Sequence, residues 1–147
     1  MIYVLDASAL VSYLRDEAGS DIVSDLLKKA VDGEDTIYMN IVNLIEVHYA
    51  NIRSLGSEKA AMILKEILCA PIQVVNDISD AVFQQSARLK ASYKCSLADT
   101  IGLATAKELS AHFVTSDHHE LEQISKNEPI PFVWLPPHPK TKSTTLP

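Results

Sequence analysis

Four acidic residues stand at positions where a carboxylate could do chemistry: Asp6, Glu46, Asp99 and Asp117. Asp6 follows the apolar run IYVL, and Asp117 follows the segment HFVTS, so each comes directly after residues with strand character. A carboxylate in such a place can bind a metal ion, and it can also cap the helix that follows. The question is therefore whether the fold brings the four acids to one point.

Glu46 has the most unusual surroundings of the four. On a helix, Val42, Tyr49 and Ala50 lie at i−4, i+3 and i+4, so we expect Glu46 at the edge of buried surface. Burying a carboxylate there is costly unless it pairs with a cation or binds a metal ion. We favour a functional role for Glu46 over an ion pair with a lysine or arginine elsewhere.

The other acids have structural alternatives that stay open. Asp6 can cap the helix after it, SLAD ending at Asp99 has the pattern of a capping box, and Asp117 can cap a short helix. Glu120 lies one turn beyond Asp117 and can share its face. The adjacent histidines 118 and 119 point about 100° apart on a helix. Because a two-histidine zinc site needs i, i+4 spacing, we interpret them as surface or substrate-side residues.

The elements that must position these acids alternate along the chain. Apolar and β-branched runs predict strands at 2–6, 36–40, 71–76, 112–116 and 131–135. Helical periodicity predicts helices at 7–17, 20–30, 41–54, 57–69, 79–93, 96–110 and 117–125. Ser20, Ser57 and Ser79 are the expected N-caps, and Gly56 is the expected stop of the third helix. This alternation predicts an α/β fold whose parallel sheet is covered on both faces and carries its site at the carboxyl ends of the strands.

Composition narrows the class of protein. The 147 residues are 47% hydrophobic and carry a net charge of −6, so any nucleic acid must meet a local basic patch or metal ions. We expect one domain over 1–135 and a flexible tail over 136–147, which is rich in Pro, Lys and Thr. No apolar run reaches the ~18 residues of a membrane span, and no secretory signal is visible. Two cysteines without metal or redox spacing favour a cytoplasmic protein.

Motifs of other α/β proteins are missing. The first turn, DASAL, lacks the glycines of a dinucleotide site, and no Walker loop or Gly-x-Ser-x-Gly elbow is present. Instead, the segments VLDASAL, NLIEV, LADTIGLATA and FVTSD together resemble the PIN domain, most closely the VapC-type toxins of toxin–antitoxin pairs. The resemblance covers residues 2–135. It implies a three-layer α/β/α fold with a central parallel sheet of four to five strands.

The resemblance also implies a function. VapC-type proteins are Mg²⁺- or Mn²⁺-dependent endoribonucleases, usually homodimers, that a cognate antitoxin holds inactive. By this resemblance the catalytic residues are Asp6, Glu46, Asp99 and Asp117, with Asp6, Asp99 and Asp117 as metal ligands and Ser8, Thr115 and Glu120 as supporting residues. Carboxylate oxygens suit these ions, which lower the pKa of a bound water. Attack of water on phosphorus would leave 5′-phosphate and 3′-hydroxyl ends.

RNA must also be held near the acids. The candidate cations are Arg15, Arg53, Lys90 and Lys94, because they follow helices that carry site acids or precede Asp99. A solvated helix face is the plainer interpretation for each of them. Two other functions stay open: a PIN nuclease of RNA processing without an antitoxin, and a catalytically silent PIN module that binds metal or protein. The presence of every motif acid favours an enzyme, and the RNA target (tRNA, rRNA or mRNA) is not specified by the sequence.

Overall fold

The computed structural model describes residues 1–137. These residues form one parallel sheet of five strands in the order β3–β2–β1–β4–β5. The strands are β1 (Ile2–Leu5), β2 (Thr36–Asn40), β3 (Gln73–Val75), β4 (His112–Thr115) and β5 (Phe132–Trp134). The helices are α1 (Ala7–Leu14), α2 (Ser20–Val31), α3 (Ile41–Leu55), α4 (Ser57–Cys69), α5 (Asp80–Ser92), α6 (Leu97–Glu108) and α7 (His118–Asn127).

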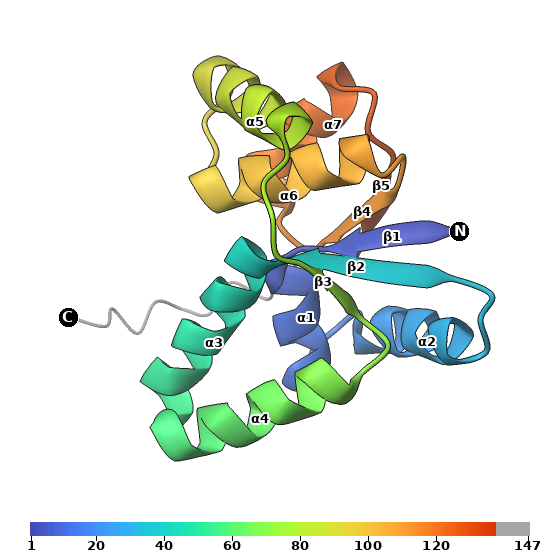
Figure 1. Cartoon of the computed structure of the whole chain (residues 1–147), viewed down its shortest axis with the longest axis vertical. Helices are drawn as coiled ribbons and strands as arrows, with labels where there is room; N and C mark the ends of the chain where they lie inside the picture. The colour runs from blue at the N-terminus through green and yellow to red at the C-terminus, as the bar shows by residue number, and fades with distance from the viewer. Residues whose placement is uncertain (138–147) are drawn as a thin grey trace.

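The helices form a layer on each side of the sheet. Helices α5, α6 and α7 lie on one side, and α1 to α4 lie on the other (Figure 1). This arrangement confirms the predicted three-layer α/β/α fold, and each predicted element is present within a few residues of its expected bounds. Of the tail expected at 136–147, residues 138–147 lie outside the described part of the chain.

Two predicted helix caps are wrong. Ser20 and Ser57 are the first residues of α2 and α4, and the N-caps are the preceding glycines, Gly19 and Gly56. Both glycines have positive φ, +95° and +87°, which residues with a side chain rarely adopt. The Ser20 hydroxyl instead donates to the Asp16 carboxylate at 3.1 Å. The stop at Gly56 and the Ser79 cap of α5 are confirmed.

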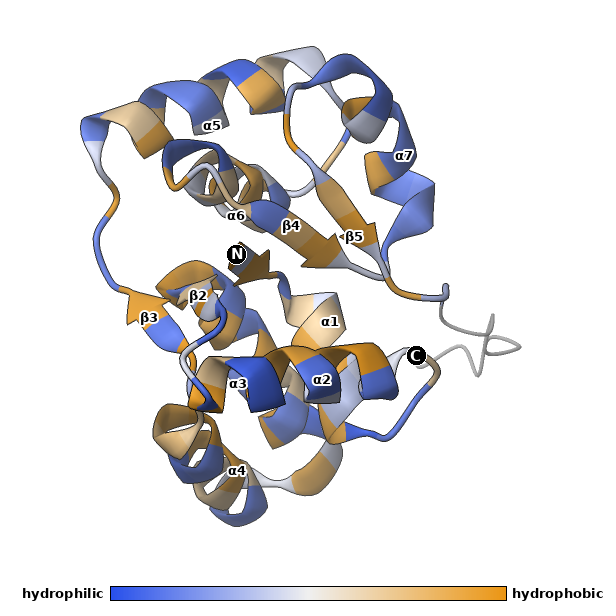
Figure 2. Cartoon of the chain, turned by 90° about the vertical axis from the view of Figure 1, so that its right-hand side faces the viewer, coloured by the Kyte–Doolittle hydropathy of each residue, from blue (hydrophilic) through white to orange (hydrophobic). Residues whose placement is uncertain are grey.

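The central strands are fixed by apolar packing on both faces. In β1, Tyr3 and Leu5 pack into the cluster under α1 to α4, whereas Val4 packs into the cluster on the opposite side. In β4, Val114 and Phe113 divide between the two clusters in the same way. Strands β4 and β5 are coloured as hydrophobic in Figure 2, and the helices around them carry both hydrophilic and hydrophobic segments. This packing therefore holds the ends of β1 and β4, and the residues that follow them, in fixed positions.

The parallel pairing of β1 with β4 brings distant segments together. Leu5 pairs with Val114, and the Asp6 N–H donates to the Val114 carbonyl at 3.1 Å. The carboxyl ends of these two strands thus lie side by side, as the sequence predicts. Among the helices of residues 1–137, none combines the length and hydropathy needed to cross a membrane.

Candidate functional site

Asp6 is buried at the end of β1, where it is only 2% exposed. Its Oδ1 accepts hydrogen bonds from the Ala9 N–H at 2.8 Å and the Ser8 hydroxyl at 2.7 Å, and its Oδ2 accepts one from the Thr115 hydroxyl. Burial raises the pKa of Asp6 to about 7, against the opposing effect of these hydrogen bonds and with a contribution from the charge of Asp99. Asp6 therefore caps α1, as one interpretation predicts, and also ties β1 to β4.

Two supporting hydroxyl groups fix the loop that carries Asp117. Thr115 is fully buried, and its hydroxyl accepts a hydrogen bond from the Asp117 N–H at 3.0 Å while it donates to Asp6. The Ser8 hydroxyl accepts one from the Ser116 N–H at 3.0 Å. The chain after β4 is thus held by hydrogen bonds that lead, through Thr115 and Ser8, to the carboxylate of Asp6 at the end of β1.

Asp99, Asp117 and Glu120 form what we call the acidic cluster. One carboxylate oxygen from each of them lies within 4.8 Å of the others. Asp99 and Asp117 also act as caps: Asp99 accepts from the Ser96 N–H at 3.3 Å in a capping box, and Asp117 accepts from the Glu120 N–H at 3.3 Å. Each cap uses one carboxylate oxygen, so the structural and functional interpretations of these acids are compatible.

The acids share a negative field. The pKa of Asp99 is raised to about 6, mainly by burial and also by the charges of Asp117 and Glu120, against the opposing effect of the hydrogen bonds from Ser96. Burial, followed by the charge of Asp99, also raises the pKa of the half-buried Glu46. Within residues 1–137, none of these acids forms an ion pair with a lysine, arginine or histidine. The site therefore lacks a compensating cation of its own.

The donor set fits a hard divalent ion. Three carboxylates that converge without a cation repel one another, and an ion with a preference for oxygen ligands, such as Mg²⁺ or Mn²⁺, removes that repulsion. The geometric group contains Glu120, which the sequence suggests only as a supporting residue. Asp6 is not in the group, because its carboxylate faces the donors of Ser8, Ala9 and Thr115. A direct bond from Asp6 to a metal ion stays a prediction.

Asn43 links the helices that carry Glu46 and Asp99. It is buried on α3, and its Nδ2 donates to the Ala98 carbonyl at the start of α6, at 3.2 Å. At Gly102 of α6, an added Cβ would lie 2.8 Å from Asn43 Oδ1, so only glycine allows this approach. Sequence reasoning missed Asn43. The sequence feature that could have pointed to Asn43 is its position three residues before Glu46, on the same face of the helix.

Two of the candidate RNA-binding cations lie away from the acidic cluster. Arg15 is exposed at the C-terminal end of α1, whereas Asp6 caps the start of that helix, so the helix of about 12 Å separates them. Arg53 lies over the Tyr49 ring at 5.0 Å, near the C-terminal end of α3. Neither residue contacts a site acid in this structure, and their role in RNA binding stays a prediction.

The two candidate lysines differ from each other. The Lys90 ammonium donates to the Cys95 carbonyl at 2.6 Å and so closes the turn before α6. Lys94 is exposed and lines a pocket of about 350 Å³ together with Glu120 and His119. Of the four candidate cations, Lys94 is therefore the one that shares a pocket with the acidic cluster.

The two adjacent histidines also have different places. His118 is half-buried, its Nε2 lies 2.6 Å from the Leu135 carbonyl oxygen, and its ring stacks on Trp134 with centroids 4.5 Å apart. His118 thus joins the start of α7 to the end of β5, and it also lines a pocket with Ser8 and Asp117, so its expected place on the substrate side stays a prediction. His119 is exposed, as expected.

The family model described as PIN domain matches residues 3–127. The fold is similar to VapBC2 from Rickettsia felis bound to a promoter DNA fragment, with 19% identity, 90% of this chain and 98% of that chain covered, and a TM-score of 0.71. It is also similar to DNA-bound VapBC from Salmonella typhimurium, with 14% identity, 90% and 97% coverage, and a TM-score of 0.71.

A third similar structure is VapC20 from Mycobacterium tuberculosis, described as a sarcin–ricin loop cleaving toxin. Its sequence is 12% identical to this one, the match covers 84% of this chain and 95% of that chain, and the TM-score is 0.60. At such identities the likeness shows a common fold. Among curated proteins, no significant match to the sequence is found.

Proposed function

This chain belongs to the PIN domain family, and from that premise we propose that it is a metal-dependent endoribonuclease, the toxin of a toxin–antitoxin pair. PIN domains are generally nucleases. The observation that carries the proposal is the acidic cluster, because three carboxylates converge at the carboxyl edge of the sheet without an ion pair to any lysine, arginine or histidine of residues 1–137. Such an arrangement destabilises the protein unless a ligand uses it.

The chemistry follows from the residues around the cluster. Asp99, Asp117 and Glu120 would hold a Mg²⁺ or Mn²⁺ ion, which would supply charge neutralisation for the phosphodiester and a more acidic water. Glu46 is outside the acidic cluster, and burial, followed by the charge of Asp99, raises its pKa, so it is a suitable acceptor for the proton of the attacking water. In-line attack of this water on phosphorus would break the bond to the 3′ oxygen, which would take a proton from solvent and leave as a hydroxyl, and the phosphate would stay on the 5′ end.

Asp6 has a positioning role in this proposal. Its carboxylate receives the Thr115 hydroxyl, and the same hydroxyl holds the Asp117 N–H. The loop from Thr115 to Asp117 is therefore set before substrate arrives, which is the condition for electrostatic catalysis without reorganisation. A contact from Asp6 to the ion through water is compatible with this arrangement.

Protein partners complete the proposal. Similar structures are toxin–antitoxin complexes, and by analogy we assign this chain a cognate antitoxin and a homodimeric state in the cytoplasm. An exposed apolar stripe on α3, made of Ile45, Tyr49 and Ile52, supports a protein interface. The related function, an RNA-processing nuclease without an antitoxin, differs only in this partner. Toxicity on expression, relieved by the product of an adjacent gene, separates the two.

The test uses purified protein and a mixture of cellular RNAs. We expect cleavage in Mg²⁺ or Mn²⁺, no cleavage in excess EDTA, and recovery when the metal is restored. Sequencing the new 5′ ends then identifies the RNA and the cut site. Full cleavage in EDTA would contradict the metal dependence, and intact RNA under every metal condition would contradict the nuclease function.

A further inference from the structure

Two pockets border the acidic cluster, one on each side of His119. The first, which we call the serine-side pocket, measures about 460 Å³ and is lined by Ser8, Ser116, Asp117 and His119 among others. The second, the lysine-side pocket, measures about 350 Å³ and includes Tyr93, Lys94, His119 and Glu120. Asp117 of the cluster lines the first pocket and Glu120 lines the second, so the cluster lies at the boundary between them.

We propose that the two pockets receive the nucleotides on either side of the scissile phosphodiester of a single-stranded RNA, with His119 as the residue that positions the strand between them. This inference rests on the proposed nuclease function and names the side chains that position its substrate. A base in a duplex is paired and stacked, so it cannot enter a pocket of this kind, whereas an unpaired nucleotide can turn its base away from the strand.

The lysine-side pocket combines groups that suit a nucleotide. Tyr93 offers an aromatic ring, and its hydroxyl donates to Glu128 at 3.2 Å, which fixes the direction of the ring. The exposed ammonium of Lys94 has no ion-pair partner within residues 1–137. Aromatic rings stack on bases without regard to sequence, and a lysine neutralises a phosphate.

The serine-side pocket has a different chemistry. Its charged lining residues are the acids Asp117 and Glu122, and no lysine or arginine of residues 1–137 lines it. Carboxylate and hydroxyl oxygens accept hydrogen bonds from the amino groups of bases, and the two carboxylates repel phosphates. The phosphate backbone of the strand therefore lies near Lys94, and the edge of a base enters the serine-side pocket.

His119 is the side chain common to both pockets. It is exposed in the first turn of α7, and its ring makes no hydrogen bond or ring contact within residues 1–137. Its neighbour His118, in contrast, is engaged with Leu135 and Trp134. A planar ring between two pockets can stack on a base or donate to the strand, and nothing in the described fold requires it to be there for stability.

The experiment measures cleavage and binding of one fluorescein-labelled oligoribonucleotide that contains the mapped cut site, in Mg²⁺. We expect His119→Ala to raise KM roughly 10-fold, the loss of about one stacked base, with a smaller change in kcat. Lys94→Ala should raise KM and reduce the salt dependence of binding. Lys65→Ala, on the exposed face of α4, is the matched control and should equal the parent. His119→Phe should restore KM if the ring acts by stacking.

The outcomes separate this inference from the proposed function. If the parent cleaves the oligonucleotide but His119→Ala and Lys94→Ala keep the parental KM, the pockets do not hold the strand and the inference fails. Equal cleavage of the same sequence in a duplex would overturn it as well. Fluorescence anisotropy reports binding without turnover. Should the parent bind but not cleave any RNA, the nuclease proposal fails, and weaker binding by the His119→Ala variant would still support the pockets.

Discussion

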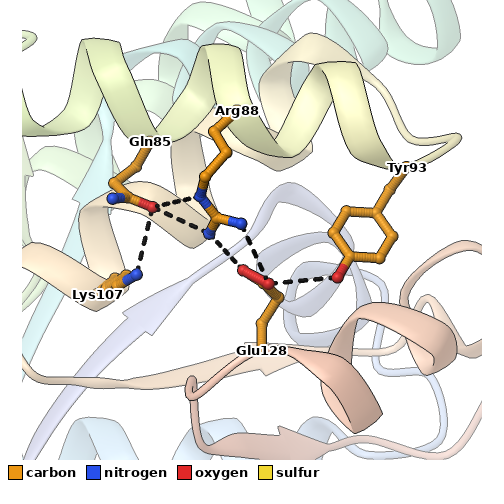
Figure 3. A network of polar contacts seen from close by, with 5 residues as sticks. All are labelled: Gln85, Arg88, Tyr93, Lys107 and Glu128. Carbon is orange, nitrogen blue, oxygen red and sulfur yellow. Dashed lines mark hydrogen bonds and ion pairs between the residues drawn. The ribbon is translucent and has the colours of Figure 1, made fainter.

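Two polar clusters on helices α5, α6 and α7 differ in whether a cation neutralises their carboxylates. At the starts of α6 and α7, the acidic cluster gathers carboxylates without a cation. Along α5 and at the C-terminal ends of α6 and α7, a paired network joins Gln85, Arg88, Tyr93, Lys107 and Glu128 (Figure 3). In the paired network, Glu128 accepts hydrogen bonds from both terminal nitrogens of Arg88 and from the Tyr93 hydroxyl.

The pKa values follow this difference. The hydrogen bonds and charge of Arg88 lower the pKa of Glu128, whereas burial and neighbouring acids raise the pKa of Asp99 to about 6. A carboxylate that the chain neutralises itself stabilises the fold. A carboxylate without a cationic side chain beside it destabilises the metal-free fold, and its negative charge stays available to bind a metal ion. The comparison thus distinguishes a structural from a functional cluster by the presence of a cation.

The largest effect is expected from Asp99→Asn. Asparagine keeps the shape and can still cap α6, but it removes a charge from the acidic cluster. Removal of one preorganised electrostatic group commonly reduces a rate on the order of 100-fold or more, so cleavage and toxicity should be lost. The melting temperature without metal should be unchanged or higher, because repulsion falls. Parental cleavage with a parental melting temperature would leave Asp99 as a helix cap only.

Thr115→Val should have a smaller effect on activity and a larger one on stability. It removes the hydroxyl that donates to the buried Asp6 and holds the Asp117 N–H. We expect the free energy of unfolding to fall by about 1–3 kcal/mol and cleavage to fall roughly 10-fold, as for other groups that orient metal ligands. Urea denaturation and initial rates measure the two. Thr115→Ser, which keeps the hydroxyl, should stay close to the parent, and equal losses in both variants would contradict this role.

The metal-free protein should become less stable as pH rises from about 5 to about 8. Asp6 and Asp99 have pKa values of about 7 and about 6 in the fold, above their ordinary value of 3.8. In this window the folded state binds more protons than the unfolded state, so rising pH favours unfolding. Thermal melts in EDTA measure the slope, which Asp99→Asn should reduce and Mg²⁺ should offset. A melting temperature that rises over this range would contradict the unpaired state of these acids.

Glu128→Gln should give the smallest effect. It replaces the carboxylate of the paired network with a neutral group of similar shape, and Arg88 is partly exposed. The amide oxygen of glutamine can still accept the hydrogen bond from the Tyr93 hydroxyl, so the ring of Tyr93 keeps its direction in the lysine-side pocket. The expected loss in the free energy of unfolding is about 1 kcal/mol, and cleavage should stay within about twofold of the parent. Chemical denaturation and the RNA assay check both values. A large loss of cleavage here would remove the distinction between the two clusters.

The sequence predicted the fold, and the meeting of two strand ends that carry acids, for clear physical reasons. Alternating periodicities specify parallel strands, and parallel strands that end in acids bring those acids to one edge, which the positions of Asp6 and Asp117 confirm. The order of the five strands did not follow from local patterns, because it depends on contacts between residues far apart in the chain.

Details of the site were harder to predict. Whether Asp6 or Glu120 completes the acidic cluster depends on which carboxylate oxygens are already used by hydrogen bonds. Asn43 and the Ala98 carbonyl are 55 positions apart, so their contact has no local signal. The place of His118 was missed for the same reason, since its partners lie at the end of β5.

The contact between Asp6 and Thr115 also affects when the site can exist. These residues are 109 positions apart, and all three residues of the acidic cluster come after residue 98. During synthesis, Asp6 is therefore made well before Thr115, Asp117 and Glu120. A nascent chain that ends before Glu120 lacks the complete site, and the ribosome that makes this proposed ribonuclease is not exposed to its activity until that residue has been made.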